Sequence, residues 1–169
     1  MSQLGSAPVP PLRPDDHVRG RDSDPLLVVY GDFTCPRCAL AWERLRDQPF
    51  RVAFRHFALR AKHPRAVALA QATEAAARQG AFWPMADALW TDQGHIDDPH
   101  LWQRCATLGL DLDRFEADRR DEATADRVRR DVRDALRAGV AATPTLFTAG
   151  VATGHPGPPD AAFLASVAS

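Results

Sequence analysis

Apolar residues in the first third of the chain follow two different periods. The run LLVVY at 26–30 is continuous and partly β-branched, which predicts a strand buried on both faces of an α/β sheet. Apolar residues then recur with the i, i+3, i+4, i+7 spacing of an amphipathic helix, at Cys38, Ala41, Trp42 and Leu45. The segment RVAFRHFAL at 51–59 alternates, with apolar residues on one face and arginines on the other. These elements predict a βαβ unit with parallel strands.

Helical patterns fill residues 64–138. Pro64 begins an Ala-rich helix that Gly80 ends, and a second helix runs from about Phe82 to Trp90. Asp98 is the expected N-cap of a third helix. A short helix around 112–115 precedes a longer one that ends near 138. The longer helix is expected to bury its apolar residues: Val128, Val132, Ala135 and Leu136.

The remaining segments complete the predicted order β-α-β, helical block, β-β-α. TPTLFTAGVATG at 143–154 predicts a hairpin that turns at Ala-Gly, followed by a polar loop and a last helix. Residues 1–25 are rich in proline and polar residues, which predicts an extended or flexible arm. We therefore divide the chain into the arm, an α/β domain formed by 26–63 and 139–169, and a helical insertion at 64–138.

Composition and charge are those of an ordinary globular protein and disfavour nucleic-acid-binding and membrane-spanning classes. Apolar residues make up 45% of the chain, an ordinary globular value, and the net charge is −1. This balance predicts no nucleic-acid or membrane partner. No apolar run approaches the ~20 residues of a membrane span, and the first residues lack the pattern of a signal peptide. We expect a cytoplasmic protein.

The stretch TCPRC carries the candidate chemistry. Pro36 suits the first position of a helix, which places Cys35 near the N-cap, where unpaired N–H groups favour a thiolate. Arg37 adds a positive charge nearby. Cys38 lies one turn further on the apolar face of the helix and is expected to be buried. An exposed, activated sulfur beside a shielded one is the arrangement that dithiol–disulfide exchange requires.

Two other uses of this cysteine pair have less support. Static disulfides are rare in the cytoplasm, and the chain has three cysteines, an odd number. A zinc site requires further ligands, but there is no second CxxC, and Pro99 separates His95 from His100. We therefore expect no metal and no cofactor. Cys105 lies on an apolar helical face and is expected to be a buried free thiol, and His56 a hydrogen-bonded core histidine.

Several motifs together resemble one family. VVYGDFTCPRC, FRHFAL, LGLD and GVAATPTLFTAG are similar to segments of bacterial DsbA-like thioredoxin-fold oxidoreductases. The nearest branch is the DSBA-type thioredoxin domain, which includes domains fused to Na⁺/H⁺ antiporters. The resemblance implies an α/β thioredoxin fold (βαβ … ββα) interrupted by an all-helical insertion.

The resemblance also implies roles for individual residues. Cys35 would be the nucleophile, Cys38 the resolving cysteine, and Pro144 a cis-proline beside them, although an X-Pro bond is cis only ~5% of the time. Thr143, Pro36 and Arg37 would contact the substrate. Thr143 would do so through its backbone groups, which would pair with an extended substrate segment. The implied partners are proteins that contain thiols or disulfides, or a low-molecular-weight thiol such as glutathione.

Two features leave alternatives open. Many thioredoxin-fold enzymes have a buried acid six residues before the first cysteine, where this chain has Val29. Asp32 is the nearest substitute as a proton relay, and equally a turn residue at a strand end. One alternative is a non-catalytic redox sensor or binding module, in which the cysteine pair reports oxidation to a partner. Another is a glutathione-dependent isomerase or transferase on the same fold. These enzymes typically use a single Ser or Cys, so an intact CxxC disfavours them. The direction of exchange is not determined by the sequence.

Overall fold

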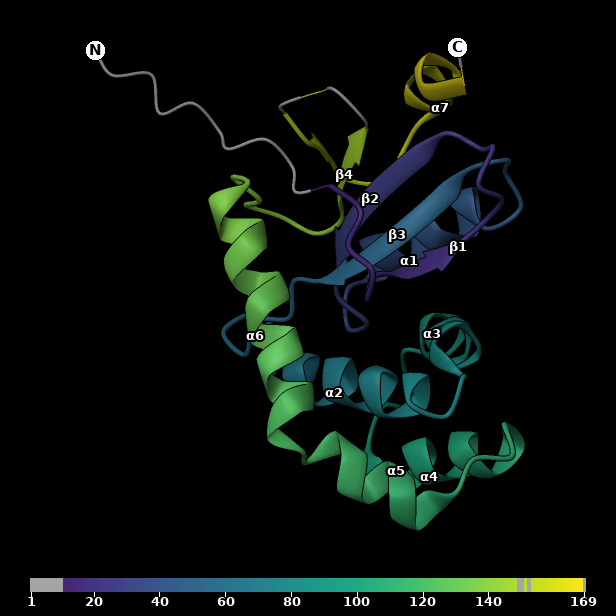
Figure 1. Ribbon diagram of the computed structural model, residues 1–169, viewed down its shortest axis with the longest axis vertical. Coiled ribbons are helices and arrows are strands. Elements are labelled where there is room, and N and C mark those ends of the chain that lie inside the picture. The colour runs from purple at the N-terminus through teal and green to yellow at the C-terminus, as the bar shows by residue number, and fades with distance from the viewer. Residues whose placement is uncertain (1–10, 149–150, 152, 169) are drawn as a thin grey trace.

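A five-stranded mixed sheet forms the upper half of the molecule (Figure 1). The computed structural model describes residues 11–148, 151 and 153–168. The strand order is β1-β3-β2-β4-β5. The strands are β1 (His17–Arg19), β2 (Leu26–Gly31), β3 (Arg51–His56), β4 (Thr145–Thr148) and β5 (His155–Pro156). β2 and β3 are parallel and the other neighbouring pairs are antiparallel.

β2 lies at the centre of the sheet, and its side chains alternate between two cores. Leu27 and Val29 pack against the apolar face of α1 (Pro36–Leu45) and against the helical insertion. Val28 and Tyr30 pack on the opposite face, with residues from the end of α6 (Glu122–Arg137). This confirms the prediction of a strand that is buried on both faces. Because both faces of β2 are packed, the end of this strand and the turn that leads into α1 are held in place between two cores.

The helical insertion lies below the sheet (Figure 1). It consists of α2 (Ala66–Ala77), α3 (Phe82–Thr91), α4 (Asp98–Thr107), α5 (Leu112–Arg119) and α6. The long helix α6 leads back from this layer to the sheet, and α7 (Ala161–Ala168) ends the fold. The observed order of elements confirms the predicted α/β class. Among the described residues, no helix has both the length and the apolar character needed to cross a bilayer.

Four local predictions are wrong. The arm predicted over 1–25 includes β1, which pairs with β3; residues 1–10 lie outside the described part of the chain. The N-cap of α4 is Asp97, whose carboxylate accepts the His100 N–H, and not Asp98. The second strand of the predicted hairpin is β5, which falls in the segment expected to be a loop; the Ala-Gly turn lies outside the described residues.

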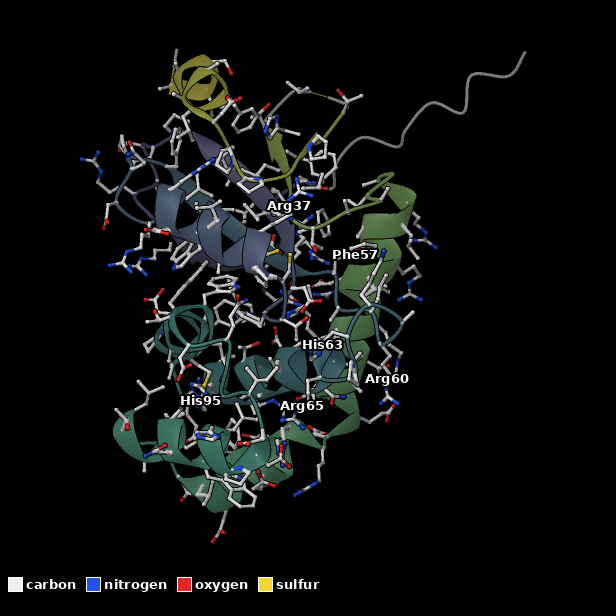
Figure 2. All side chains as sticks on the ribbon, turned by 180° about the vertical axis from the view of Figure 1, so that it is seen from behind. Arg37, Phe57, Arg60, His63, Arg65 and His95 are labelled. Atoms are coloured by element: carbon white, nitrogen blue, oxygen red, sulfur yellow. The ribbon has the colours of Figure 1, made fainter. Side chains whose placement is uncertain are left out.

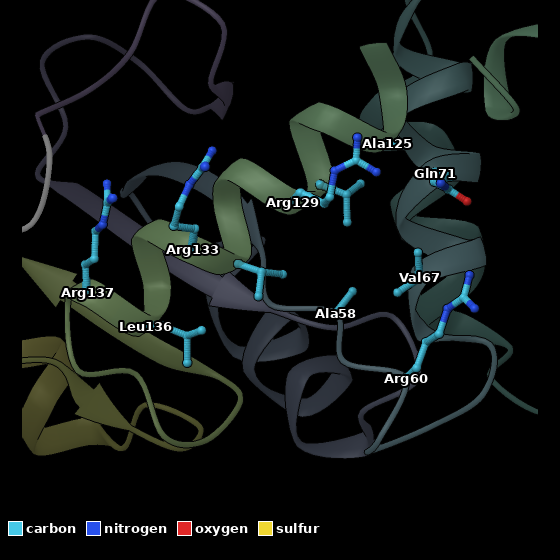
Figure 3. A pocket seen from close by; sticks show the side chains of 11 residues that line it. Ala58, Arg60, Val67, Gln71, Ala125, Arg129, Arg133, Leu136 and Arg137 are labelled. Carbon is cyan, nitrogen blue, oxygen red and sulfur yellow. The ribbon is translucent and has the colours of Figure 1, made fainter. Parts of the chain in front are cut away.

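Leu136 is the fourth correction, because its side chain is 59% exposed. It lies one turn beyond Val132, near the C-terminal end of α6 (Figure 3). Helical periodicity identifies the apolar face of α6, but it does not indicate how far along the helix that face is covered.

Candidate active site

Cys35 occupies the N-terminal boundary of α1. Its backbone is extended (φ −89°, ψ 117°), and Pro36 begins the helix behind it. The residue is half-buried. The sulfur is therefore exposed enough to react and close to the N–H groups of the first turn.

The pKa of Cys35 is strongly lowered, from 9.0 to about 5. The largest cause is a hydrogen bond from the thiol of Cys38, and a contact with Thr143 and the backbone N–H groups of Cys38 and Arg37 add to it. Burial acts in the opposite direction and is outweighed. Cys35 is consequently a thiolate at neutral pH, the nucleophilic form of cysteine.

Cys38 is the opposite case. It is 3% exposed, and burial raises its pKa far above the ordinary value, with the neighbouring Cys35 thiolate acting in the same direction. The N–H of Asp32 donates to its sulfur at 3.4 Å. One sulfur of the pair is thus ionised and accessible while the other is protonated and shielded.

Thr143 and Pro144 form the wall opposite Cys35. The peptide bond between them is cis, and the Cys35 sulfur lies 3.5 Å from the Thr143 carbonyl oxygen. The Gly157 N–H donates to the Pro144 carbonyl at 2.7 Å, which connects this wall to the segment before α7. The structure therefore brings Thr143 and Pro144 to the cysteines from over a hundred residues away in the chain.

Arg37 and Asp32 lie close to the cysteine pair in the sequence. The Arg37 guanidinium, expected to add positive charge near Cys35, points elsewhere. The guanidinium of Arg37 extends toward Gly157, where a Cβ atom would come within 2.5 Å of Nη2 (Figure 2). Arg37 contributes to the pKa of Cys35 through its backbone N–H. The Asp32 carboxylate accepts from the N–H and hydroxyl of Thr34 at 2.8 and 2.9 Å. Burial raises the pKa of Asp32, so its role as a proton relay stays a prediction.

Gln93 is a site residue that the sequence analysis misses. It follows α3 in the insertion, and its side-chain amide donates to the carbonyls of Phe33 and Cys35 at 2.8 and 3.0 Å. These bonds connect the insertion to the loop that carries Cys35. A lone polar residue in a loop 58 residues away gives no signal of this contact in the sequence.

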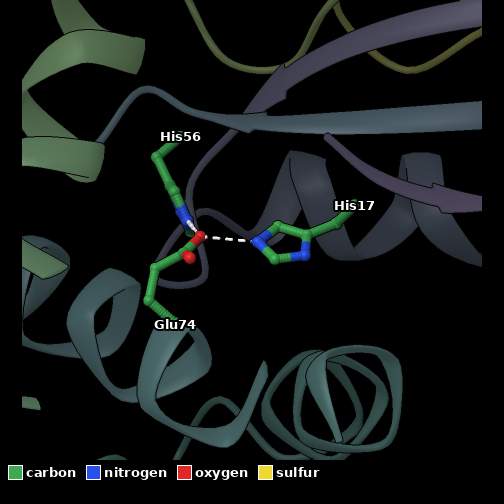
Figure 4. Close-up of side chains that lie close together, drawn as sticks. All are labelled: His17, His56 and Glu74. Atoms are coloured by element: carbon green, nitrogen blue, oxygen red, sulfur yellow. Dashed lines mark hydrogen bonds and ion pairs between the residues drawn. The ribbon is translucent and has the colours of Figure 1, made fainter. Parts of the chain in front are cut away.

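A buried histidine–glutamate cluster joins the sheet to the insertion (Figure 4). The Nε2 atoms of His17 on β1 and His56 on β3 each lie 2.7 Å from the same Oε1 of Glu74 on α2. This confirms His56 as a hydrogen-bonded core residue. The three side chains are also a group that could hold a metal ion, with ligand atoms within 4.8 Å of one another. The distance of 2.7 Å from each histidine nitrogen to the shared Glu74 oxygen is a hydrogen-bond distance.

Cys105, the third cysteine, is part of α4 in the helical insertion. It is fully buried on α4 among apolar side chains, and burial raises its pKa to about 11. This confirms the prediction of a buried free thiol. A protonated thiol without access to solvent is unreactive.

Comparisons with known proteins agree with this geometry. Residues 26–167 match the DSBA-like thioredoxin domain. The chain is 40% identical over 164 residues to a Na⁺/H⁺ antiporter NhaA 1 of Mycolicibacterium vanbaalenii, covering 91% of this chain and 26% of that protein. The chain thus spans about a quarter of the length of such curated relatives.

Solved structures show the same fold. A thioredoxin-like oxidoreductase from Silicibacter pomeroyi superimposes with a TM-score of 0.81 at 20% identity, covering 92% of this chain and 91% of that one. Wolbachia pipientis α-DsbA1 gives a TM-score of 0.77 at 20% identity, with 92% and 90% covered. The thioredoxin-like fold with a helical insertion is thereby confirmed.

Proposed function

Because the chain belongs to the DSBA-like thioredoxin domain family, we propose that it catalyses thiol–disulfide exchange with Cys35 as nucleophile and Cys38 as resolving cysteine. The observation that carries the proposal is the opposite shift of the two thiols: the pKa of Cys35 falls to about 5 while that of Cys38 is raised by burial. An attacking thiolate and a protected thiol are what the two steps of exchange require.

In the first step the Cys35 thiolate attacks one sulfur of a substrate disulfide. The substrate S–S bond breaks, a mixed disulfide with Cys35 forms, and the other substrate sulfur leaves as a thiolate. The carbonyl of Thr143, 3.5 Å from the attacking sulfur, faces the position of the incoming segment. A backbone hydrogen bond there would hold the substrate as an added strand.

In the second step the Cys38 sulfur attacks the Cys35 sulfur, the bond between Cys35 and the substrate breaks, and the Cys38 proton passes to a released substrate thiolate. The Cys35–Cys38 disulfide forms and the second substrate thiolate is released, so that two electrons pass from protein to substrate. Run in reverse, the same steps oxidise a substrate dithiol. The partners are proteins with exposed cysteines or a small thiol such as glutathione, in the cytoplasm, and no step requires a cofactor.

Trapping tests the assignment of the two sulfurs. Cys38→Ser with a disulfide-containing test protein is expected to accumulate a covalent adduct that dithiothreitol releases, because the resolving sulfur is gone. Cys35→Ser is the matched control and is expected to form none. Adduct formation through Cys38 in the Cys35→Ser variant would contradict the assignment. Multiple turnover by the unmodified protein with a thiol donor distinguishes a catalyst from a sensor, which would react once.

A further inference from the structure

A hollow of about 530 Å³, here called the α6 hollow, lies between α6, α2 and the chain that leaves β3 (Figure 3). Its floor is apolar, with Ala58 and Val128 buried and Val67 and Val132 half-buried. Leu136 stands at one end with 59% of its surface exposed. A hollow of this size is large enough to hold a few apolar side chains.

Arginines surround this floor. Arg129, Arg133 and Arg137 follow one another at four-residue intervals on α6, beside the apolar stripe Val128, Val132 and Leu136. Arg60 lies at the other side of the floor, next to Val67 of α2 (Figure 3). No carboxylate lines the hollow in the part of the chain that the structure describes.

The charges around the hollow are only partly neutralised. Arg129 is paired with Glu122 and Asp126, and Arg137 lies 3.9 Å from Asp134. Arg60 and Arg133 are exposed, and neither has a carboxylate partner among the described residues. The hollow therefore combines an uncovered apolar floor with uncompensated positive charge.

Ala58, in the floor of the hollow, and Cys35 both follow strands that end at the same edge of the sheet. β2 and β3 are parallel, with Gly31 in register with His56, and the Phe57 N–H donates to the Gly31 carbonyl at 2.8 Å. Cys35 follows Gly31 by a few residues, and Ala58 follows His56 as closely. Figure 2 labels Arg37, Phe57 and Arg60, which descend in this order from the α/β domain toward the insertion.

We propose that the α6 hollow binds a segment of the protein substrate in which apolar side chains alternate with aspartate or glutamate. The inference rests on the proposed exchange activity and adds a substrate class to it. The apolar side chains would cover Val132 and Leu136, and the carboxylates would pair with Arg60 and Arg133. Such pairing of opposite charges around an apolar contact favours acidic over basic segments.

A binding measurement tests the α6 hollow independently of thiol–disulfide exchange. A fluorescent peptide with Leu and Glu alternating, and with serine in place of its cysteine, is titrated with the protein and followed by anisotropy. We expect Arg60→Glu/Arg133→Glu to weaken binding about tenfold. Arg120→Glu, which changes an exposed arginine at the end of α5 that does not line the hollow, is expected to change binding less than twofold. A Lys-for-Glu peptide that binds as well, or an acidic peptide that does not bind, would overturn the proposal.

Steady-state kinetics with different disulfide substrates distinguish failure of the hollow proposal from failure of the proposed exchange activity. With cysteine restored to the peptide, the double variant is expected to raise KM for the acidic peptide disulfide about tenfold while leaving kcat/KM for a small disulfide unchanged. Equal KM values for the acidic and basic peptide disulfides would reject the hollow while keeping the exchange activity. Absence of turnover with every disulfide would reject the activity, and the anisotropy titration would still decide whether the hollow binds the acidic segment.

Discussion

At the scale of single residues, the thiols of Cys35 and Cys38 differ in pKa because of what surrounds each sulfur. Cys35 receives hydrogen bonds at a helix N-terminus, whereas Cys38 is enclosed one turn later. The largest cause of the low Cys35 pKa is the Cys38 thiol itself. The buried cysteine therefore stabilises the thiolate of its neighbour.

Replacing Cys38 by alanine is expected to raise the Cys35 pKa from about 5 by about 1–2 units, because a hydrogen bond to a charged group contributes about 1.5–3 kcal/mol. Cys38→Ser retains an O–H donor and is the matched control, with a smaller rise expected. Thiolate absorbance near 240 nm against pH, together with alkylation rates, gives both values. Equal pKa values in the alanine variant and the unmodified protein would show that the helix N-terminus alone sets the ionisation.

Gln93 offers a second test at this scale. Gln93→Glu removes the donors to Phe33 and Cys35 and places a negative charge near the thiolate, so the Cys35 pKa is expected to rise by about one unit. Gln93→Ala removes the donors without adding charge and is expected to have a smaller effect. Gln79→Glu, which alters an amide bonded to Asp111 far from the cysteines, is the control. The same absorbance titration measures each variant, and an unshifted Gln93→Glu would contradict a positioning role.

At the scale of elements, Glu74 connects α2 to β1 and β3 through His17 and His56. Burial alone would raise the pKa of Glu74, but the hydrogen bonds from the two histidines outweigh it and hold the pKa well below 4.5. A carboxylate with a lowered pKa stabilises the fold above its unfolded-state pKa, and this contribution is lost as pH falls below about 4.5. The contact between insertion and sheet is thus weakened by acid.

Glu74→Gln is expected to lower the free energy of unfolding by about 3 kcal/mol at neutral pH, because it leaves buried histidines without their charged acceptor. The loss of stability between pH 5 and pH 3 is expected to be shallower than in the unmodified protein. Urea unfolding across this range measures both effects. The exposed Glu43→Gln is the control, with a change within about 0.5 kcal/mol expected. Parallel pH profiles for Glu74→Gln and the unmodified protein would contradict the argument.

At the scale of the whole molecule, Asp131 joins three parts of the chain. Its carboxylate accepts from Arg13 at 2.7 Å, from the His56 N–H at 3.0 Å and from Arg127 at 3.3 Å, and the residue is fully buried. It thereby connects the N-terminal segment, the end of β3 and α6. We expect the α/β domain and the insertion to unfold together.

Asp131→Asn is expected to lower the free energy of unfolding by about 3 kcal/mol, since Arg13 and Arg127 lose a buried counter-charge. Asp126→Asn, an exposed change on the same helix, is expected to lower it by less than about 1 kcal/mol. Denaturation followed by circular dichroism and by tryptophan fluorescence is expected to give coincident transitions in the unmodified protein. Separate transitions would show that the two parts unfold independently.

The sequence is most informative where a short stretch carries its own pattern. β2, α1 and the cysteine pair are local features of periodicity and spacing, and all three are predictable. β1 has only three residues, and it is held by pairing with β3 and by the ion pair of Asp16 with Arg55, 39 residues apart. Gln93 and the exposure of Leu136 likewise depend on contacts between distant elements, for which a single sequence contains no local signal.

The outermost strands of the sheet are its shortest, β1 with three residues and β5 with two. An edge strand exposes unpaired backbone groups that can template the addition of a strand from another molecule, and the hazard grows with its length. Edge strands this short expose few backbone groups for such pairing. The short edges thereby protect the protein from aggregating through the ends of its own sheet.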